Sequence, residues 1–156
     1  MDKRKTVALV AHDHRKRDLA EWVEFNHGTL ADHDLVCTGT TGRLIEETLA
    51  RVRGQDGGEA AAQKVTRLRS GPLGGDQQLG AMISEGRVDV LIFFWDPMEA
   101  QPHDVDVKAL LRIATVYNVA VACNRSTADF LISSPLLEQQ YQPVLKDYTD
   151  YLDRKV

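Results

Sequence analysis

Residues 88–95 read VDVLIFFW, a stretch dominated by β-branched, aromatic and aliphatic side chains. This composition predicts a β-strand, and its nearly unbroken apolar character favours a place at the centre of a sheet. The longest apolar run in the chain, Val90 to Trp95, lies within it and is far too short to cross a bilayer. The rest of the chain can be interpreted outward from this central strand.

Shorter apolar stretches and amphipathic stretches alternate on both sides of the central strand. Further strands are predicted at Thr6–Ala11, Asp34–Thr38, Val65–Arg69 and Val119–Cys123. Helices are predicted at Arg15–Phe25, Gly42–Leu49, Gln77–Glu85, Val107–Tyr117, from a cap at Ser126 or Thr127 through Ile132, and at Lys146–Arg154. Strands that alternate with helices of this length indicate an α/β fold with a mainly parallel sheet.

The stretch Arg51–Arg67 interrupts this alternation. It reads RVRGQDGGEAAAQKVTR, which is charged, rich in glycine and alanine, and without clear periodicity. We expect a solvent-exposed loop here, with at most one helical turn at Glu59–Lys64.

Length, composition and charge limit the class of protein. The chain has 156 residues, of which 43% are hydrophobic and 27% charged, as is typical of one globular domain. Its formal net charge of −4 argues against nucleic acid as a partner. The charged start, Met1–Lys5, precedes an apolar stretch too brief for a signal peptide, which predicts a cytoplasmic protein. Cys37 and Cys123 lie in apolar runs without a Cys-x-x-Cys motif and are expected to be small buried side chains.

Polar or glycine-rich segments follow four of the predicted strands. They are His12–Lys16, Thr38–Gly42, Ser70–Asp76 and the stretch from Asp96 to Asp106. Ligands of an open parallel sheet bind outside the carboxyl ends of its strands, so the four segments should meet on one rim. The sequence therefore predicts a ligand site at that rim.

The segment Thr38–Gly42 suits a phosphate. Hydroxyls and free N–H groups at a helix start accept an anion, and glycine lets the backbone approach closely. The segment has neither a P-loop nor a dinucleotide fingerprint, and a Gly/Thr turn is often only a turn. Lys16 becomes a candidate phosphate contact through its place just after the first strand, although such a lysine is ordinarily solvated.

Asp76 and His103 are the candidates for acid–base chemistry. Asp76 follows three glycines and a proline in Ser70–Gly75 and begins a predicted helix, where it is either a general base or an N-cap. His103 is followed by Asp104 and Asp106 in a predicted loop. It is either a positioned acid or electrophile, or a solvated side chain.

A metal site is an alternative use of the same rim. His12 and His14, together with His103 and nearby aspartates, contain the donor types that zinc prefers. No helical H-E-x-x-H motif and no cysteine ligand pair support this alternative, so we expect no metal.

Taken together, these segments resemble the methylglyoxal synthase family. The matching stretches occur in the family's order and are ALVAHDH (8–14), TGTTG (38–42), SGPLGGDQQLGA (70–81), DVLIFFWDP (89–97) and QPHDVDVKALLR (101–112). The resemblance implies a single-domain, three-layer Rossmann-like fold over residues 1–156. It also marks the connection around 51–67 as longer than is usual in the family.

The resemblance implies a chemical activity as well. Members convert dihydroxyacetone phosphate into methylglyoxal and inorganic phosphate, by proton abstraction to an enediolate followed by phosphate elimination, without metal or organic cofactor. A homohexamer inhibited by inorganic phosphate is also implied. The alternative is a non-catalytic regulatory module of the same fold, similar to the allosteric domain of carbamoyl phosphate synthetases.

The family's motifs assign roles to individual side chains of this chain. Asp76 matches the catalytic base, and His103 and Asp106 match the proton-handling pair beside it. The substrate and phosphate contacts match His12, Lys16, Thr38, Gly39, Thr40, Thr41, Ser70, Gly71 and His103. The remaining matches are two site carboxylates, Asp13 and Asp96, and a tail arginine that closes over the phosphate in some relatives, Arg154.

Overall fold

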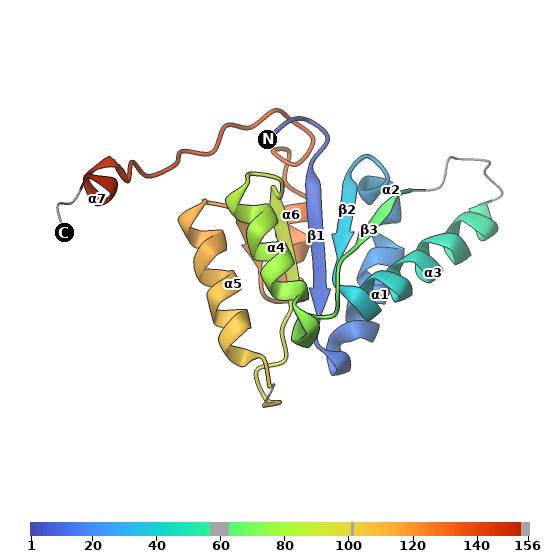
Figure 1. Ribbon diagram of the computed structural model, residues 1–156. Helices are drawn as coiled ribbons and strands as arrows, with labels where there is room; N and C mark the ends of the chain where they lie inside the picture. The colour runs from blue at the N-terminus through green and yellow to red at the C-terminus, as the bar shows by residue number, and fades with distance from the viewer. Residues whose placement is uncertain (57–62, 101, 154–156) are drawn as a thin grey trace.

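The computed structural model of the chain describes residues 1–56, 63–100 and 102–153. A single sheet forms the centre of the molecule, with its strands in the order β3-β2-β1-β4-β5 (Figure 1). The strands are β1 (Thr6–Ala11), β2 (Asp34–Cys37), β3 (Val65–Arg67), β4 (Val90–Phe94) and β5 (Ala120–Ala122). Every pairing between them is parallel, so the α/β prediction is confirmed and the sheet is parallel throughout. This is the strand order of a doubly wound, Rossmann-like fold.

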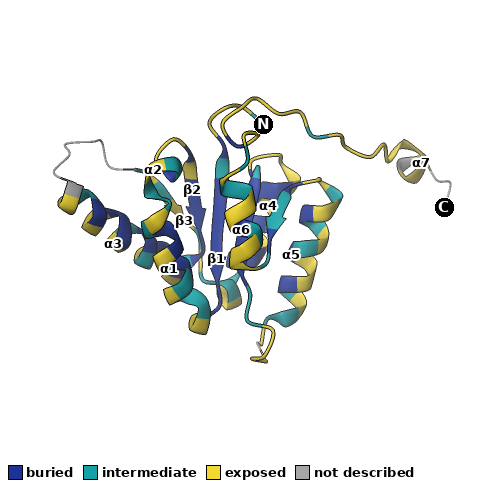
Figure 2. Ribbon diagram, turned by 180° about the vertical axis from the view of Figure 1, so that it is seen from behind, coloured by how far each residue is buried: buried dark blue, intermediate teal, exposed yellow. Residues whose placement is uncertain are grey.

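Helices cover both faces of the sheet, which makes three layers (Figure 2). The helices are α1 (Lys16–Phe25), α2 (His27–Leu30), α3 (Gly39–Asp56), α4 (Gly75–Ser84), α5 (Asp104–Val116), α6 (Arg125–Ile132) and α7 (Thr149–Leu152). Short 3-10 turns, η1 (Asp13–Arg15) and η2 (Gly71–Leu73), precede α1 and α4. Helices α1, α3 and α6 pack on one face, and α4 and α5 pack on the other.

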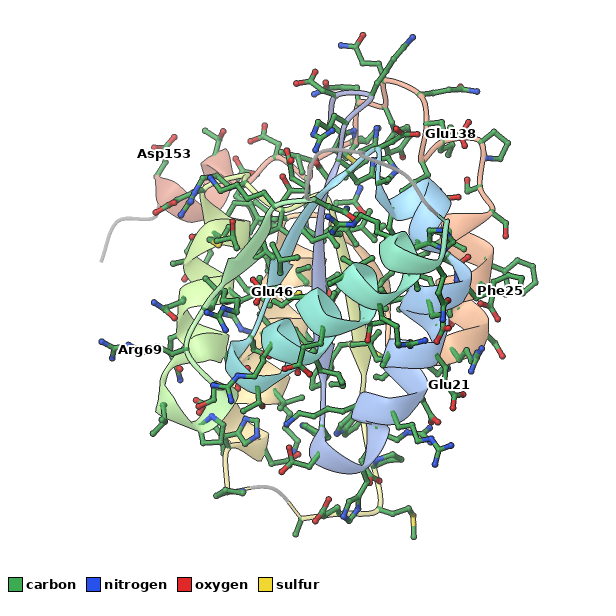
Figure 3. All side chains as sticks on the ribbon, turned by 90° about the vertical axis from the view of Figure 1, so that its right-hand side faces the viewer. Glu21, Phe25, Glu46, Arg69, Glu138 and Asp153 are labelled. Carbon is green, nitrogen blue, oxygen red and sulfur yellow. The ribbon has the colours of Figure 1, made fainter. Side chains whose placement is uncertain are left out.

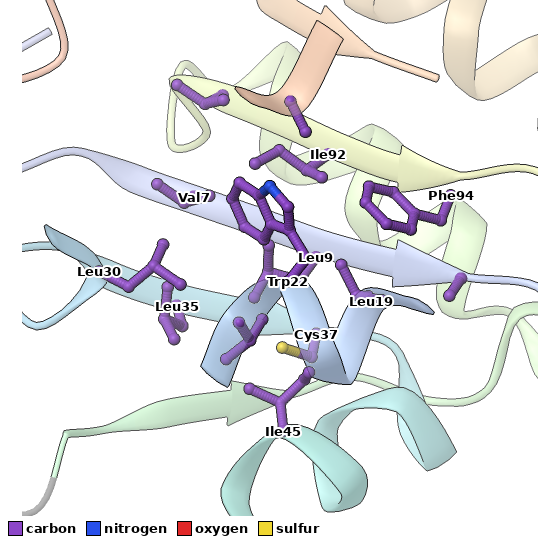
Figure 4. Close-up of a cluster of buried hydrophobic side chains, with 14 of the residues drawn as sticks. Val7, Leu9, Leu19, Trp22, Leu30, Leu35, Cys37, Ile45, Ile92 and Phe94 are labelled. Carbon is purple, nitrogen blue, oxygen red and sulfur yellow. The ribbon is translucent and has the colours of Figure 1, made fainter. Parts of the chain in front are cut away.

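Trp22 is the largest side chain in the core beneath α1, α3 and α6 (Figure 4). The spacing of Leu19, Trp22 and Val23 gives α1 one apolar face, and all three side chains are fully buried. The Trp22 indole N–H donates a hydrogen bond to Asp129 of α6 at 2.8 Å. This bond satisfies the polar atom of a buried ring and ties two helices of the layer together.

The stretch Arg51–Arg67 departs from the prediction of a loop. Helix α3 continues through its first six residues, to Asp56, because Ile45, Leu49 and Val52 form one buried stripe at helical spacing. Strand β3 occupies its last three residues. The residues between, 57–62, are not described, and the predicted turn at Glu59–Lys64 falls mostly among them.

Other predicted boundaries were also wrong, among them the start of α3, which lies at Gly39 and not at Gly42. Helix α6 is capped by the side chain of Asn124, which accepts a hydrogen bond from the Thr127 N–H at 2.9 Å, and not by Ser126 or Thr127. Helix α5 begins at Asp104, three residues before the predicted start, with His103 at its N-cap position. The loop predicted around His103 is therefore partly helical, and this places Asp106 in the first turn of a helix.

The segment after α6 crosses the end of the molecule opposite to the carboxyl ends of the strands and then extends away from it (Figure 1). The Tyr141 N–H bonds the Met1 carbonyl, and the Asn118 side chain bonds the Val144 carbonyl at 3.0 Å. Beyond these contacts the tail keeps Leu145 and Tyr151 exposed. None of the helices in the described part of the chain has the length and apolar character that crossing a membrane requires.

The two cysteines differ in burial. Cys37 is buried, and burial raises the pKa of its thiol to about 12. Cys123 is only partly buried, although burial still raises the pKa of its thiol. Neither thiol is thus activated as a thiolate, which agrees with the expectation of inert side chains but corrects the expected full burial of Cys123.

His33 is a buried histidine outside the predicted site. Its Nδ1 accepts a hydrogen bond from the Lys5 backbone N–H at 3.2 Å, and its Nε2 has no hydrogen-bond partner among the described residues. Burial is the largest cause of a lowered pKa at His33. Protonation of this ring is therefore more favourable in the unfolded chain than in the folded one.

We expect this histidine to make the folded state less stable in acid. The free energy of unfolding should fall as the pH drops below about 6.5, by at most about 1.4 kcal/mol per pH unit for this one group. Urea unfolding at a series of pH values measures the slope. His33→Asn, whose amide oxygen can still accept from the Lys5 N–H, should flatten it. An unchanged slope in this variant would contradict the prediction.

Candidate active site

A pocket of about 250 Å³ lies at the carboxyl ends of the strands, where the sequence predicts a ligand site. Loops after β1, β2 and β3 and the N-terminus of α5 contribute to it, so segments far apart in the chain meet there. Ten of the predicted site residues line it: His12, Asp13, Lys16, Thr38, Thr40, Thr41, Ser70, Gly71, Asp76 and His103. Val10, Ala11 and Pro72 complete the lining and were not predicted.

Asp76 and His103 form a buried pair in this pocket. The His103 Nδ1 lies 2.7 Å from the Asp76 Oδ2, and the two side chains are only 10% and 3% exposed. A carboxylate only accepts hydrogen bonds, so the imidazole donates through Nδ1. Asp76 is the second residue of α4 and makes no capping hydrogen bond, because Gly74 occupies the N-cap position with φ 98°. The N-cap alternative for Asp76 is thereby excluded.

Gly71 lies directly against this pair. A Cβ at position 71 would lie 2.9 Å from the His103 Cε1, which is closer than real Cβ contacts, and 3.1 Å from the Asp76 Oδ2, which is tighter than most of them. A Cβ at Gly39 would lie 2.7 Å from the Ser70 backbone nitrogen. These two glycines therefore let the loops after β2 and β3 approach each other and the acid–base pair closely.

His12, directly after β1, lines the pocket and carries an unpaired ring nitrogen. Its Nδ1 accepts a hydrogen bond from the Asp96 backbone N–H at 3.2 Å, so the neutral ring carries its proton on Nε2. The Nε2 is buried and has no hydrogen-bond partner in the described part of the chain. Burial, and then the neighbouring His103, lower the pKa of His12. The lowered pKa favours the neutral form of this ring, which lines the pocket beside Asp76 and His103.

Other lining residues of the pocket carry hydroxyls and one ammonium group. Lys16 reaches from α1 to the Thr40 hydroxyl at 2.6 Å and also bonds the Asp13 carboxylate. This ammonium lowers the pKa of Asp13, whose side chain is 83% exposed. Thr38 and Thr41 are buried at the start of α3. A helix start, hydroxyls and an ammonium are the groups that hold a phosphate.

Similarity to known proteins extends over the whole chain. The MGS-like domain family matches residues 18–123. A methylglyoxal synthase of Maridesulfovibrio salexigens is 57% identical over 157 residues, which cover 100% of both chains. One of Coxiella burnetii (strain RSA 493 / Nine Mile phase I) is 52% identical over 150 residues, or 96% of each chain. The crystal structure of methylglyoxal synthase from Elizabethkingia anophelis NUHP1 matches with a TM-score of 0.88 and 52% identity, covering 100% of this chain and 95% of that one.

The chain belongs to the methylglyoxal synthase family. The resemblance that rested on five short stretches is thereby confirmed, and so is the fold that it implied. The roles that the family's motifs assign to single residues remain predictions, which the geometry of the pocket makes specific.

Three of the described residues assigned from the methylglyoxal synthase motifs do not line the pocket. Asp106 borders a separate hollow between α4 and α5, which also touches Asp76, and its backbone N–H donates to the His103 carbonyl at 2.9 Å. Asp96 holds His12 through its backbone, while its carboxylate accepts the Met98 N–H at 3.0 Å. Gly39 packs beneath Ser70. Arg154 lies outside the described residues.

The structure does not bring together the residues that would bind zinc, His12, His14 and His103. His12 is buried in the pocket with its Nδ1 engaged, whereas His14 is exposed and faces Asp96 and Glu99. Within the described ranges, the one group of potential metal ligands is His14, Asp96 and Glu99, which includes neither His12 nor His103. The geometry therefore does not support a zinc site that joins His12, His14 and His103.

Gly71→Ala should impair any methylglyoxal synthase activity of this chain. The added methyl group has to displace His103 or Asp76, and a misplacement of about 1 Å at reacting groups costs up to about a hundredfold. We expect kcat/KM to fall at least about tenfold. Gly80→Ala, on α4, is the matched control because its methyl would meet only Ile113, at 3.9 Å. Equal activity of both variants would contradict the prediction.

Proposed function

We propose that this chain is a methylglyoxal synthase, a lyase that converts dihydroxyacetone phosphate into methylglyoxal and inorganic phosphate. The observation that carries the proposal is the buried Asp76–His103 pair, which faces phosphate-binding groups across one pocket. The identity of 52–57% to methylglyoxal synthases over nearly their whole length supports the substrate. The reaction needs a base, a donor to the carbonyl oxygen and a hold on the phosphate, and the pocket lining offers each of these.

Asp76 is the proposed base for the first step. Its Oδ2 accepts the hydrogen bond from His103, which fixes the carboxylate and leaves the Oδ1 to receive a proton from the carbon that carries the hydroxyl. That carbon's electron pair then forms the enediolate with the neighbouring carbonyl. His103 stabilises the charged carboxylate before the transfer, and it is placed to move the proton onward afterwards.

The enediolate oxygen needs a hydrogen-bond donor. A donor that is not already bound to another group serves best, because no existing hydrogen bond has to be broken. Sequence reasoning assigns this role to His103, but the Nδ1 of that ring is engaged with Asp76. The Nε2–H of His12 has no partner among the described residues and lies in the same pocket, with the two imidazole centroids 5.6 Å apart. We therefore propose His12 as the main donor. A neutral imidazole serves as electrophile in the same way in triosephosphate isomerase.

Elimination in the second step depends on how the phosphate is held. The C–O bond to phosphate breaks readily only when it stands roughly perpendicular to the enediolate plane, where it overlaps the π system. Lys16 at the start of α1, the threonines of Thr38–Thr41 at the start of α3 and the Ser70–Gly71 segment after β3 all line the pocket. Groups from three segments of the chain can fix one rotamer of the phosphate as well as bind its charge.

The regulatory-module alternative makes a different demand on the pocket. A sensor of small phosphorylated ligands needs the Lys16 and Thr38–Thr41 side of the pocket, but it has no use for a buried carboxylate–imidazole pair. Burying a charged carboxylate is costly unless it is hydrogen-bonded. We take the presence of Asp76 and His103 in the pocket as support for catalysis.

One assay tests the function directly. The purified protein is incubated with dihydroxyacetone phosphate in excess chelator, and methylglyoxal and inorganic phosphate are measured. We expect equal amounts of the two products and a rate that chelation leaves unchanged, because the proposed steps use only protein side chains. Binding of the substrate without either product would favour the regulatory module. Activity lost to chelator and restored by a divalent ion would overturn the mechanism.

We further propose the homohexamer and the inhibition by inorganic phosphate that the family implies. The apolar side chains exposed on the tail, among them Val144, Leu145 and Tyr151, support association with other copies. The same phosphate-binding residues that hold the substrate would also bind free phosphate. Sedimentation velocity with and without phosphate measures the assembly, and a stable monomer would contradict it.

A further inference from the structure

A second hollow of about 390 Å³ adjoins the catalytic pocket at the edge of the sheet. Thr40 and Ser70 line both hollows, so the two are neighbours at these residues. The remaining lining residues of the second hollow are Gly39, Arg43, Arg67, Leu68 and Arg69. Three of its seven lining residues are thus arginines and none is acidic, although the chain as a whole has a net charge of −4.

The three arginines come from two different elements. Arg43 lies in the first turns of α3, whereas Arg67 ends β3 and Arg69 follows it. The stem of Arg67 lies across α3, since a Cβ at Gly42 would be 2.7 Å from the Arg67 Cγ. Packing therefore fixes the base of this side chain beside the hollow.

Little negative charge neutralises these arginines. Arg67 faces Glu46 at 3.5 Å, whereas Arg43 and Arg69 form no ion pair among the described residues. Figure 3 shows Arg69 extending into solvent at the edge of the molecule, with Glu46 on α3. Other arginines lie closer to a carboxylate, within 3.3 Å: Arg4, Arg15, Arg17, Arg51 and Arg87.

We propose that Arg43, Arg67 and Arg69 form a second anion subsite, which binds the distal phosphate of a small ligand carrying two phosphate groups. The proximal phosphate would occupy the catalytic pocket, between Lys16 and the threonines, so the proposal rests on the phosphate-binding side of the proposed function. Guanidinium groups bind phosphate through charge-assisted hydrogen bonds in a fixed fork. Ligands of this class then compete with the substrate and bind more tightly than phosphate alone.

Inorganic pyrophosphate is the simplest probe with two phosphate groups. Calorimetric titrations in chelator compare its affinity with that of inorganic phosphate, for the natural chain and for Arg43→Gln/Arg69→Gln. Both side chains are exposed and make no ion pair among the described residues, so their loss should not disturb folding. Arg53→Gln/Arg112→Gln is the matched control, because it removes two arginines that also make no ion pair there and lie outside both hollows.

We expect pyrophosphate to bind the natural chain at least about tenfold more tightly than phosphate. This advantage should shrink to less than about threefold in Arg43→Gln/Arg69→Gln and persist in the control, while the affinity for phosphate stays unchanged in both. If the control lost the affinity advantage of pyrophosphate equally, the advantage would come from the overall charge of the protein and not from a subsite. A parallel loss of phosphate affinity would place these arginines at the first phosphate instead. Either result, or no advantage in the natural chain, would overturn the proposal.

Calorimetry separates this proposal from the proposed activity. Binding is measured without turnover, so a chain that makes no methylglyoxal still reports on the second subsite. If the chain makes methylglyoxal but binds pyrophosphate and phosphate equally tightly, the proposed second subsite is refuted and the proposed activity is not.

Discussion

Asp76→Asn should lower kcat for methylglyoxal formation at least about a hundredfold, the lower end of what a general base contributes. The amide has the size of the carboxylate and can still accept the hydrogen bond from His103, but it cannot take a proton from carbon. Stability should hardly change, because Asp76 caps no helix and its shape is preserved. Initial rates with dihydroxyacetone phosphate measure the loss.

Two measurements on Asp76→Asn distinguish the loss of a base from a loss of binding or of folding. The affinity for inorganic phosphate should remain within about threefold of the natural chain, because the proposed phosphate-binding residues, Lys16 on α1 and Thr40 and Thr41 on α3, lie on other helices than Asp76. The urea midpoint should also be unchanged. If this variant kept activity within a few-fold of the natural chain, Asp76 would not be the base.

His12→Asn should lower kcat by about a hundredfold to a thousandfold, which is the loss measured for single oxyanion-hole donors. The asparagine oxygen takes the place of the His12 Nδ1 and can still accept the Asp96 N–H, but nothing replaces the donor at Nε2. His12→Gln is the matched variant, because its amide N–H falls near the Nε2 position. We expect His12→Gln to keep at least about ten times the activity of His12→Asn.

The comparison of the two His12 variants tests the donor and not the fold. Both remove the same ring, and both remove a group whose pKa burial lowers, so their stabilities should change alike. Equal losses of activity would assign the stabilisation of the enediolate to another group, and His103 would be the first candidate.

Most of the fold could be predicted because apolar runs and helical periodicity are local signals. Strand β1 was predicted to the residue, at Thr6–Ala11, and β4 lies within the predicted Val88–Trp95. The C-terminal part of α3 was missed because glycine and charged residues hide the single buried side chain, Val52, that extends its apolar stripe. The cap of α6 at Asn124 was missed because several adjacent residues can cap a helix equally well in sequence alone.

The residues of the site were easier to predict than their partners. Asp76, His12 and His103 follow strands or begin helices, and the parallel order of the strands brings such positions to one rim. The sequence does not indicate which nitrogen of which imidazole is free. That difference between His12 and His103 depends on the Asp96 backbone N–H and the Asp76 carboxylate, which are contacts across the fold.

The parallel sheet has a consequence for how this protein is made. Strand β1 lies inside the sheet and pairs with β4, which comes much later in the chain. Beside this pairing, the Thr6 N–H donates a hydrogen bond to the Asp89 carboxylate, 83 residues away in the sequence. Closing so long a loop costs entropy before any contact repays it, and parallel sheets accordingly fold slowly. During synthesis, His12 leaves the ribosome long before His103 does. The pocket therefore cannot assemble on a nascent chain until more than half of the sequence has emerged, and the early strands need protection from aggregation until then.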